Sequence, residues 1–396
     1  MYKESIFKKL LALLFCITIF IFFIKSNSHT ALLKIVDYIN QDFSEESAPS
    51  MSDIESDYAE GLWKNQSFIN LNGAMAKLLH MRGYYSSIGM YVTDDYYIVS
   101  AYPKTSTDYE YEQMLSFKSF LDEQGVNLMY VNQPTKYVDD SLFSRSFGIE
   151  SYSNRNADLF LQRISDAGIY VIDLREKMQE DGLNVADMFY RTDHHWTTAS
   201  GLWATQKIAE GLNAYCGYSI DLSLYDSQNY IFKTWENCWL GEQGKKLAVT
   251  YIGLDDYTEI KPNFPTSYTF ITKDDGQVDG TFDDFIDETR YNTESDISTA
   301  SSWHYSYSRR NCVNNNAKYG KVLLLADSFA QVTQPFISLG VGETYSLILR
   351  GYDDSFDLRQ YIIENEFDTV LICYAQFMIG AHDDPNNVNH RMFTFE

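Results

Sequence analysis

The chain has 396 residues, of which 45% are hydrophobic, and a formal net charge of −24 at pH 7. This length and apolar content predict a globular protein with one large core or two smaller ones. The negative charge argues against nucleic acid as a partner, because phosphate backbones are bound by basic surfaces. It also disfavours long-range attraction to a polyanionic glycan.

Residues 1–26 have the pattern of an N-terminal signal anchor. Three lysines precede an apolar run over residues 10–24 that only Thr18 interrupts. The run approaches the ~20 residues that a bilayer requires, and its positive flank is expected on the cytoplasmic side. A cleaved signal peptide is the alternative, although no clear small-x-small cleavage site follows. We therefore expect a membrane-anchored protein whose remaining residues are extracytoplasmic, at the cell surface.

An acidic, Ser-rich segment at 27–60 is expected to be a stalk, because it contains few large apolar residues. A folded domain over 61–396 follows, with regular patterns beginning near Phe68. Four cysteines lie in this domain, and their spacing matches no zinc site. Four exported cysteines could pair in three ways, and free thiols are equally possible, so the sequence leaves open the disulfide state of Cys216, Cys238, Cys312 and Cys373.

Helices and short apolar strands alternate in the first part of the domain. Thr107 and Glu110 have the spacing of a capping box, and a helical apolar stripe follows and ends at Gly125. Residues 126–131 then read as a buried strand. A second helix ending at Gly168 and a strand over 169–172 repeat the pattern, and Thr197 or Thr198 can cap the next helix.

The alternation stops over 214–320, which we interpret as an inserted, partly β segment, most simply a solvated decoration. It resumes with a buried strand at 321–326 and a helix predicted from Ser328 to Leu339. Two further strands, at 345–349 and 369–373, flank a helix that carries Leu358, Tyr361 and Ile362. This order predicts an α/β fold with a parallel sheet and crossover helices.

The run from Tyr190 to Trp196 reads Tyr-Arg-Thr-Asp-His-His-Trp. On an extended segment Asp193 and His195 point to the same side, and His194 to the other. The carboxylate of Asp193 can then hold one nitrogen of His195 and leave the other nitrogen free as a base. A structural turn that buries His and Trp is the simpler interpretation of such a run.

Ser328 is the candidate nucleophile, because it follows a buried strand at the carboxyl edge of the predicted sheet, where ligands bind in open α/β folds. The amino end of the next helix offers free N–H groups to an oxyanion. A serine at this position is also a common helix cap. No G-x-S-x-G elbow is present, so the usual α/β-hydrolase arrangement is not indicated.

These motifs resemble a known family. The 190–196 run is similar to the signature of the DHHW family, and Leu325-Ala326-Asp327-Ser328 resembles the Gly-Asp-Ser block of SGNH hydrolases, with Ala in place of Gly. Asp-x-His precedes Ser here, as in the alginate O-acetyltransferase proteins, whose SGNH order is circularly permuted. The resemblance implies a permuted, flavodoxin-like sheet and a catalytic triad of Ser328, His195 and Asp193.

The same comparison places Gly351 at the family's Gly block. No Asn stands at the third block, where the family has its side-chain oxyanion donor, and the candidates for that donor here are Arg350, Tyr374 and Gln376. The resemblance also implies an O-acetyltransferase that acts on a cell-surface or secreted polysaccharide. Its expected acyl donor is a multispanning membrane acyltransferase, and it needs no cofactor or metal.

Three alternatives stay open at this point. A carbohydrate acetyl esterase uses the same triad, and a glycan-binding module without catalysis also accommodates the many aromatic residues. Asp-His-His additionally resembles the motif of the Mn²⁺-dependent DHH phosphoesterases, which need further metal ligands on earlier strands. The strand ends here offer Asn132, Gln133 and Asp173, a poor set.

Overall fold

The structure is a computed structural model of the chain. It describes residues 65–82, 89–272, 276–286, 311–317, 319–353, 355–380, 384–385 and 387–396, with isolated positions between 13 and 39. The chain divides into two units, Met1–Leu79 and His80–Glu396. Most of the predicted anchor and stalk lie outside the described residues. Within the described part, no helix has the length and apolar character needed to cross a bilayer. In the first unit α4 spans Asn65–Leu78.

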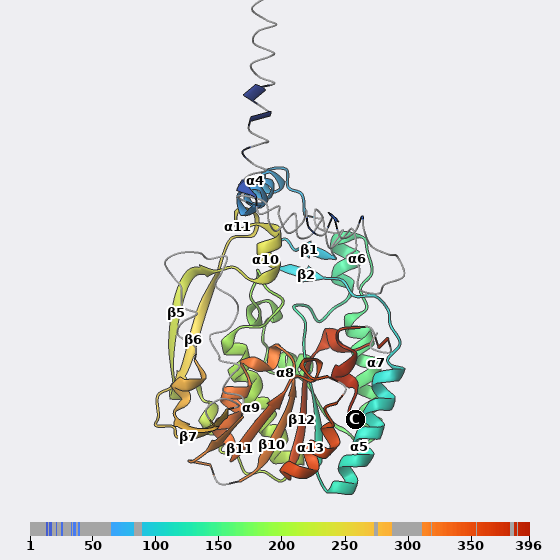
Figure 1. Cartoon of the computed structure of the whole chain (residues 1–396), viewed down its shortest axis with the longest axis vertical. Coiled ribbons are helices and arrows are strands. Elements are labelled where there is room, and N and C mark those ends of the chain that lie inside the picture. The colour runs from blue at the N-terminus through green and yellow to red at the C-terminus, as the bar shows by residue number, and fades with distance from the viewer. Residues whose placement is uncertain are drawn as a thin grey trace, which may run out of the picture. The chain divides into compact units, whose positions relative to one another are not determined.

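An eight-stranded sheet lies at the centre of the second unit (Figure 1). In spatial order its strands are β4 (Tyr170–Asp173), β3 (Asn127–Gln133), β12 (Thr369–Ala375), β10 (Lys321–Ala326), β11 (Glu343–Leu347), β9 (Asn311–Asn314), β7 (Tyr268–Thr272) and β8 (Gly276–Gly280). The first five run parallel, and the last three are antiparallel to their neighbours. Counted cyclically from β10, the parallel strands have the order 2-1-3-4-5, which is the flavodoxin-like order.

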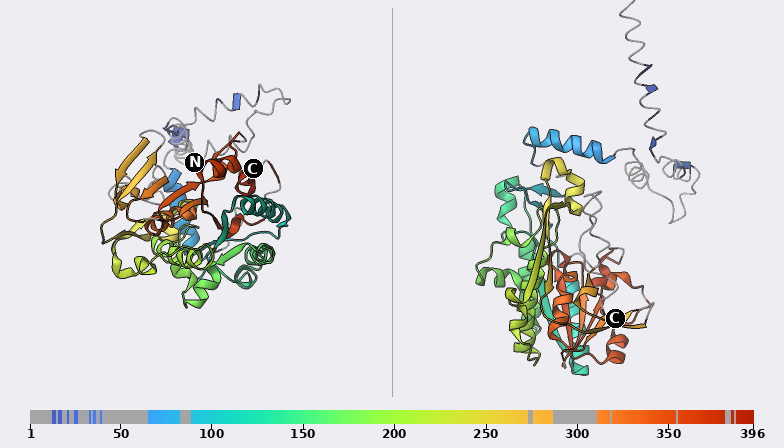
Figure 2. Two further views of the ribbon diagram at one scale, coloured as in Figure 1. Left: turned by 90° about the horizontal axis from the view of Figure 1, so that it is seen from below. Right: turned by 90° about the vertical axis from the view of Figure 1, so that its left-hand side faces the viewer.

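Helices cover both faces of the sheet (Figures 1 and 2). Met129 and Tyr130 are adjacent in β3 and so point to opposite faces. Met129 lies against Gly211 of α9 (Thr198–Tyr215), whereas the Tyr130 ring packs edge-on against Phe160 of α7 (Ser153–Asp166). The helix α12 (Gln334–Gly340) packs beside α9, and α5 (Asp108–Gln124) packs beside α7 and α13 (Leu358–Asn365).

The predicted α/β fold with a mostly parallel sheet is confirmed. The strand predicted at 321–326 coincides with β10, and Thr197 caps α9 by accepting a hydrogen bond from the backbone N–H of Ser200. The predicted capping box at Thr107 is wrong. Its side chain makes no cap bond and accepts one from Arg163 instead, because α5 and α7 pack together.

The helix predicted from Ser328 to Leu339 is also wrong in its first part. A three-residue 3-10 helix, Phe329–Gln331, comes first, and α12 begins only at Gln334. Pro335 stands at the start of α12, where its missing N–H costs least. The break separates Ser328 from the regular helix.

The inserted segment is more than a solvated decoration. Its strands β7, β8 and β9 extend the central sheet, and the rings of Tyr268 and Phe270 are fully buried in the main core. The strands β5 (Tyr230–Trp239) and β6 (Asp255–Pro262) form a separate antiparallel ribbon. Figure 1 shows this ribbon on the left side of the molecule, below α10 (Glu242–Leu247) and α11 (Val249–Ile252).

The remaining elements are short. A hairpin of β1 (Met90–Val92) and β2 (Ile98–Ser100) packs by Val99 against Tyr137 and Phe143, the latter from α6 (Ser141–Phe147). The helix α8 (Leu174–Glu180) follows β4. The five cysteines are all unpaired.

Candidate active site

The Tyr190–Trp196 run forms a tight loop rather than an extended segment. Phe189 and Trp196 make an antiparallel bridge, and the residues between them form bends. Within the loop Asp193 Oδ1 accepts the backbone N–H of His195 at 3.0 Å. Such a side-chain turn is a common use of Asp. The expected extended geometry is therefore wrong, although Asp193 and His195 still meet.

Asp193, His195 and Ser328 form a continuous hydrogen-bonded chain. His195 Nδ1 lies 2.6 Å from Asp193 Oδ1, and His195 Nε2 lies 2.7 Å from Ser328 Oγ. A neutral imidazole carries one N–H. With that proton on Nδ1 and donated to Asp193, Nε2 is the acceptor that faces the Ser328 hydroxyl. Ser328 lies two residues after the end of β10 and is half-buried.

His194 does not point away from this chain, contrary to the sequence-based expectation. Its Nδ1 lies 3.3 Å from Asp193 Oδ1, and its ring centroid lies 3.8 Å from that of His195. Burial, followed by the neighbouring His195 charge, lowers the pKa of His194 to about 3. The imidazole of His194 is therefore neutral at ordinary pH. In the described part of the chain, no hydrogen bond joins His194 to Ser328.

The side chain of Asp193 is completely buried, so its negative charge requires hydrogen-bond donors or a positive charge nearby. Burial alone would raise the pKa of its carboxyl, but the charge of His195 and hydrogen bonds from it outweigh burial and hold the pKa well below the usual value. Its second oxygen, Oδ2, accepts the backbone N–H of Glu242 at 2.8 Å. A carboxylate satisfied on both oxygens stays ionised and fixed in direction.

Asp255, a buried carboxylate on β6, holds Thr192, the residue before Asp193. Asp255 Oδ2 accepts both the backbone N–H and the hydroxyl of Thr192, at 2.8 and 2.6 Å. The Thr192 hydroxyl oxygen in turn accepts the backbone N–H of Gly241 at 2.8 Å. The ribbon of the inserted segment thereby clamps the loop that carries Asp193.

Trp196 connects the same loop to the nucleophile. Its indole N–H donates to the backbone carbonyl of Phe329, next to Ser328, at 3.0 Å, and its ring is fully buried. On the other side of Ser328, Asp327 accepts the backbone N–H groups of Phe329 and Ala375. Burial raises the pKa of Asp327. Ser328 is thus held from both sides.

Lys136 lies buried beside the loop. Its Nζ donates to the backbone carbonyl of Arg191 at 3.0 Å, and burial lowers its pKa to about 7, against the opposing charges of Asp193 and Asp255. A small cavity of about 20 Å³ adjoins Lys136, His194 and Phe377. That volume holds roughly one water molecule.

The side chains predicted as oxyanion donors have hydrogen-bond partners of their own in the structure. The Tyr374 hydroxyl donates to the Met392 carbonyl, and the Gln376 amide donates to Ser153 and Asn154. Both donors are therefore committed elsewhere, because these side chains are buried in the core. Arg350 donates to Asn389 through one nitrogen, and its charge opposes the burial that raises the pKa of Asp327. The Gly351 N–H donates to Ile348.

The backbone of Ser328 offers a further donor that the side-chain candidates do not. Among the described residues, no group accepts a hydrogen bond from the Ser328 backbone N–H. This donor lies beside its own hydroxyl, where an oxyanion forms when the hydroxyl attacks a carbonyl carbon.

One group of potential metal ligands occurs in the described part of the chain, namely Asp193, His194 and His195. A two-metal centre of the phosphoesterase type needs more ligands than these three. The strand-end carboxylate that was considered, Asp173, is instead ion-paired with Arg175 at 2.6 Å. The donor set therefore fits a hydrogen-bonded triad better than a dinuclear site.

Several residues that shape the site have no local signal in the sequence. Gly241, Glu242 and Asp255 lie in the inserted segment and act through backbone groups or a single carboxylate. Burial is the property that marks Lys136 in the structure. Trp196 belongs to the recognised run, although its hydrogen bond does not follow from the run.

Comparison with known proteins agrees with this architecture. PatB1 from Bacillus cereus is 22% identical, with a TM-score of 0.61 over 77% of this chain and 99% of that protein. Its structure with a sulfonyl adduct is similar, with 23% identity and a TM-score of 0.58 over the same shares. A DHHW family protein from Eubacterium siraeum is 17% identical, with a TM-score of 0.50 over 74% and 91% of the two chains. These likenesses concern the fold.

No curated protein sequence matches the chain. Residues 90–275 match the family described as the SGNH hydrolase-like domain of acetyltransferase AlgX. The matched range contains Asp193 and His195, whereas Ser328 lies beyond it. The resemblance found in the sequence is confirmed by this match, which covers residues 90–275 of the chain.

Proposed function

We propose that the protein is an extracytoplasmic O-acetyltransferase that acts on a cell-surface or secreted polysaccharide through an acetyl-serine intermediate. The observation that carries the proposal is a pair of hydrogen bonds through His195: its Nε2 lies 2.7 Å from Ser328 Oγ, and its Nδ1 lies 2.6 Å from Asp193 Oδ1. The match of residues 90–275 to the model of an acetyltransferase domain supports the type of group transferred. The apolar run in residues 1–26 supports a membrane anchor and an extracytoplasmic domain.

In the first half-reaction Ser328 Oγ attacks the acetyl carbonyl carbon of the donor. Its proton passes to His195 Nε2, and the donor's leaving group departs with that proton. Asp193 stabilises the imidazolium, and its depressed pKa keeps it ionised while it does so. The Ser328 backbone N–H supports the oxyanion, and Arg350 is the candidate for a second donor.

In the second half-reaction a sugar hydroxyl gives its proton to His195 and attacks the acetyl-serine. The new ester leaves, and Ser328 recovers its proton from His195. Acetyl-coenzyme A is absent outside the cytoplasm, so the acetyl group has to arrive from another protein or from a small ester. We propose a multispanning membrane acyltransferase as that donor.

The test is product analysis with the full chain purified in detergent. An activated acetyl ester is supplied with and without oligosaccharides from the native producer, and free acetate and acetylated sugar are both measured. Acetylated sugar is expected with wild type and not with Ser328→Ala. Mass spectrometry after a brief incubation with donor alone should find the acetyl group on Ser328.

An esterase with the same triad is the second candidate, because water can replace the sugar hydroxyl in the second half-reaction. Free acetate as the sole product with every oligosaccharide would establish the esterase instead. A folded wild-type protein that neither becomes acetylated nor releases acetate would leave only a non-catalytic glycan-binding module.

A further inference from the structure

Two adjoining hollows lie at the edge of the sheet opposite to Ser328. One measures about 360 Å³ and the other about 870 Å³, and both are lined by Tyr218, Ser219 and Tyr319. The larger hollow also contacts Asn127 and Asp368, at the starts of β3 and β12. We call the two hollows together the amino-edge groove. Each lies within the size range of ligand pockets.

Ser328 lies two residues beyond the last residue of β10, and the groove touches Gly320, just before the first residue of that strand. Six strand residues rise roughly 20 Å. The groove is therefore a separate place on the molecule, too distant for a group bound there to react with Ser328. A ligand in the groove can therefore affect the reaction only by binding there, and not by reacting there.

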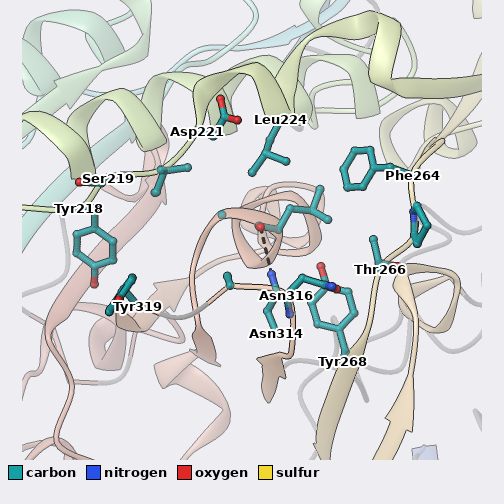
Figure 3. A pocket seen from close by; sticks show the side chains of 15 residues that line it. Tyr218, Ser219, Asp221, Leu224, Phe264, Thr266, Tyr268, Asn314, Asn316 and Tyr319 are labelled. Carbon is teal, nitrogen blue, oxygen red and sulfur yellow. Dashed lines mark hydrogen bonds between the residues drawn. The ribbon is translucent and has the colours of Figure 1, made fainter.

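The lining of the groove has the chemistry that suits sugar rings. Figure 3 shows Tyr218 and Tyr319 at one end of the smaller hollow and the Phe264 ring at the other. The Tyr319 side chain is 82% exposed, which is unusual for a large aromatic residue. The apolar faces of pyranose rings pack on such exposed aromatic faces, while the hydroxyl groups seek polar partners.

Polar partners are present beside the aromatic rings. The Ser219 hydroxyl and the Asn316 side-chain amide have no hydrogen-bond partner among the described residues. The hydroxyl of Thr266 accepts a backbone N–H from Phe282 and keeps its own proton to donate. Donors and acceptors of this kind match the hydroxyl groups of a sugar.

Charge limits the class of sugar. Carboxylates of Asp221, Glu366 and Asp368 line the groove, and among its described lining residues there is no lysine or arginine. A polyuronate would meet like charge there, in a chain whose net charge is already −24. The groove therefore suits a neutral glycan.

We infer that the amino-edge groove is a secondary glycan-binding site that holds a neutral polysaccharide remote from the reaction centre. The identity of this polysaccharide as the acetyl acceptor rests on the proposed function. A polymer bound at one edge of the sheet raises the effective concentration of its other segments near Ser328. A short acceptor cannot span both places and gains nothing from the groove.

The binding test uses the full chain in detergent with Ser328→Ala, so that no turnover occurs. Isothermal titration calorimetry is performed with cellohexaose and mannohexaose, and with an oligogalacturonate of equal length as the anionic probe. One of the neutral sugars should bind and the oligogalacturonate should not. Adding Tyr319→Ala should weaken binding about tenfold or more, and Asn316→Ala provides a second, independent lining variant.

The matched control is Tyr170→Ala, which removes another exposed tyrosine from the same edge of the sheet without touching either hollow. It should leave sugar binding unchanged. Equal binding by Tyr319→Ala, Asn316→Ala and Tyr170→Ala would overturn the inference, as would binding of neither neutral sugar. Preference for the oligogalacturonate would overturn the assignment to neutral glycans.

A kinetic test separates the groove from the triad. With Ser328 intact, Tyr319→Ala should raise KM for a polysaccharide acceptor, leave kcat unchanged and leave turnover of 4-nitrophenyl acetate unchanged. If Tyr319→Ala leaves KM for the polysaccharide unchanged, the inference of a glycan-binding groove is contradicted, even when turnover of 4-nitrophenyl acetate supports the triad. Absent ester turnover with intact sugar binding contradicts the proposed function alone.

Discussion

The backbone of Gly241 lies directly against the side chain of Asp193. A Cβ atom added at Gly241 would lie 2.3 Å from Asp193 Cβ and 2.6 Å from Asp193 Oδ2. The φ angle of Gly241 is −69°, so glycine is required by close approach and not by a left-handed conformation. This approach allows the next backbone N–H, that of Glu242, to reach Oδ2.

Gly241→Ala is therefore expected to displace the Asp193 carboxylate and to lower kcat by about 10²-fold, since misplacement by about 1 Å at a catalytic group has that cost. Overall folding should remain intact by circular dichroism. Glu242→Ala is the matched control. It removes a largely exposed side chain and keeps the backbone N–H that bonds Asp193, so its activity should stay near wild type. Equal loss in both variants would contradict the role of Gly241.

The two adjacent histidines should differ sharply. His195→Ala removes the group between Asp193 and Ser328 and should abolish measurable acetyl-ester turnover, whereas His194→Ala should reduce it by less than about tenfold. Asp193→Asn should cost up to about 10⁴-fold, as in the serine-protease example from which this magnitude is taken. Steady-state kinetics on 4-nitrophenyl acetate measures all three. A folded His194→Ala protein as inactive as His195→Ala would show that the base is misassigned.

Trp196→Phe tests the link between the loop and the nucleophile. Phenylalanine keeps most of the buried ring but leaves the Phe329 carbonyl without its indole donor. An unpaired buried acceptor costs about 1–3 kcal/mol, so chemical denaturation should show a loss of this size. Activity per folded molecule should fall as well, because Ser328 adjoins the released carbonyl. Trp203→Phe is the control, since the Trp203 indole donates to Asp181 at the protein surface. Normal activity in Trp196→Phe would make its role purely structural.

Acid should destabilise the protein partly through His194. Its folded-state pKa of about 3 lies below the ordinary value of 6.5. Between these values the unfolded chain binds the proton more readily, so stability falls as pH decreases through this window. About a third of the side chain is exposed, and solvent screens part of the effect.

Urea denaturation of wild type and His194→Gln at about pH 7 and about pH 4 measures this contribution. Wild type should lose more stability than the variant on acidification. The depressed pKa of Asp193 acts in the same direction at lower pH and is common to both proteins. An equal loss of stability in wild type and His194→Gln would mean that the pKa of His194 is not lowered in the folded state.

The sequence by itself determined the layers of the fold and the members of the candidate triad. Short apolar runs separated by helical stripes predict a parallel sheet because both faces of such strands must be buried. The position of Ser328 follows from the end of the buried run that forms β10. Asp193 and His195 were recognisable because two residues of separation lets them meet in a turn as well as in a strand.

Only the tertiary structure decided how these side chains are held. Gly241 and Asp255 are distant in sequence from Asp193, and their contacts arise when the inserted ribbon packs on the loop. The inserted strands joined the sheet because their alternate side chains complete its core, which polar composition conceals. Likewise, Tyr374 and Gln376 sit at a strand end that suggests oxyanion donors, yet burial requires each to find its own partner. Contacts of this kind join residues that are far apart in the sequence. They leave no local sequence pattern from which they could be predicted.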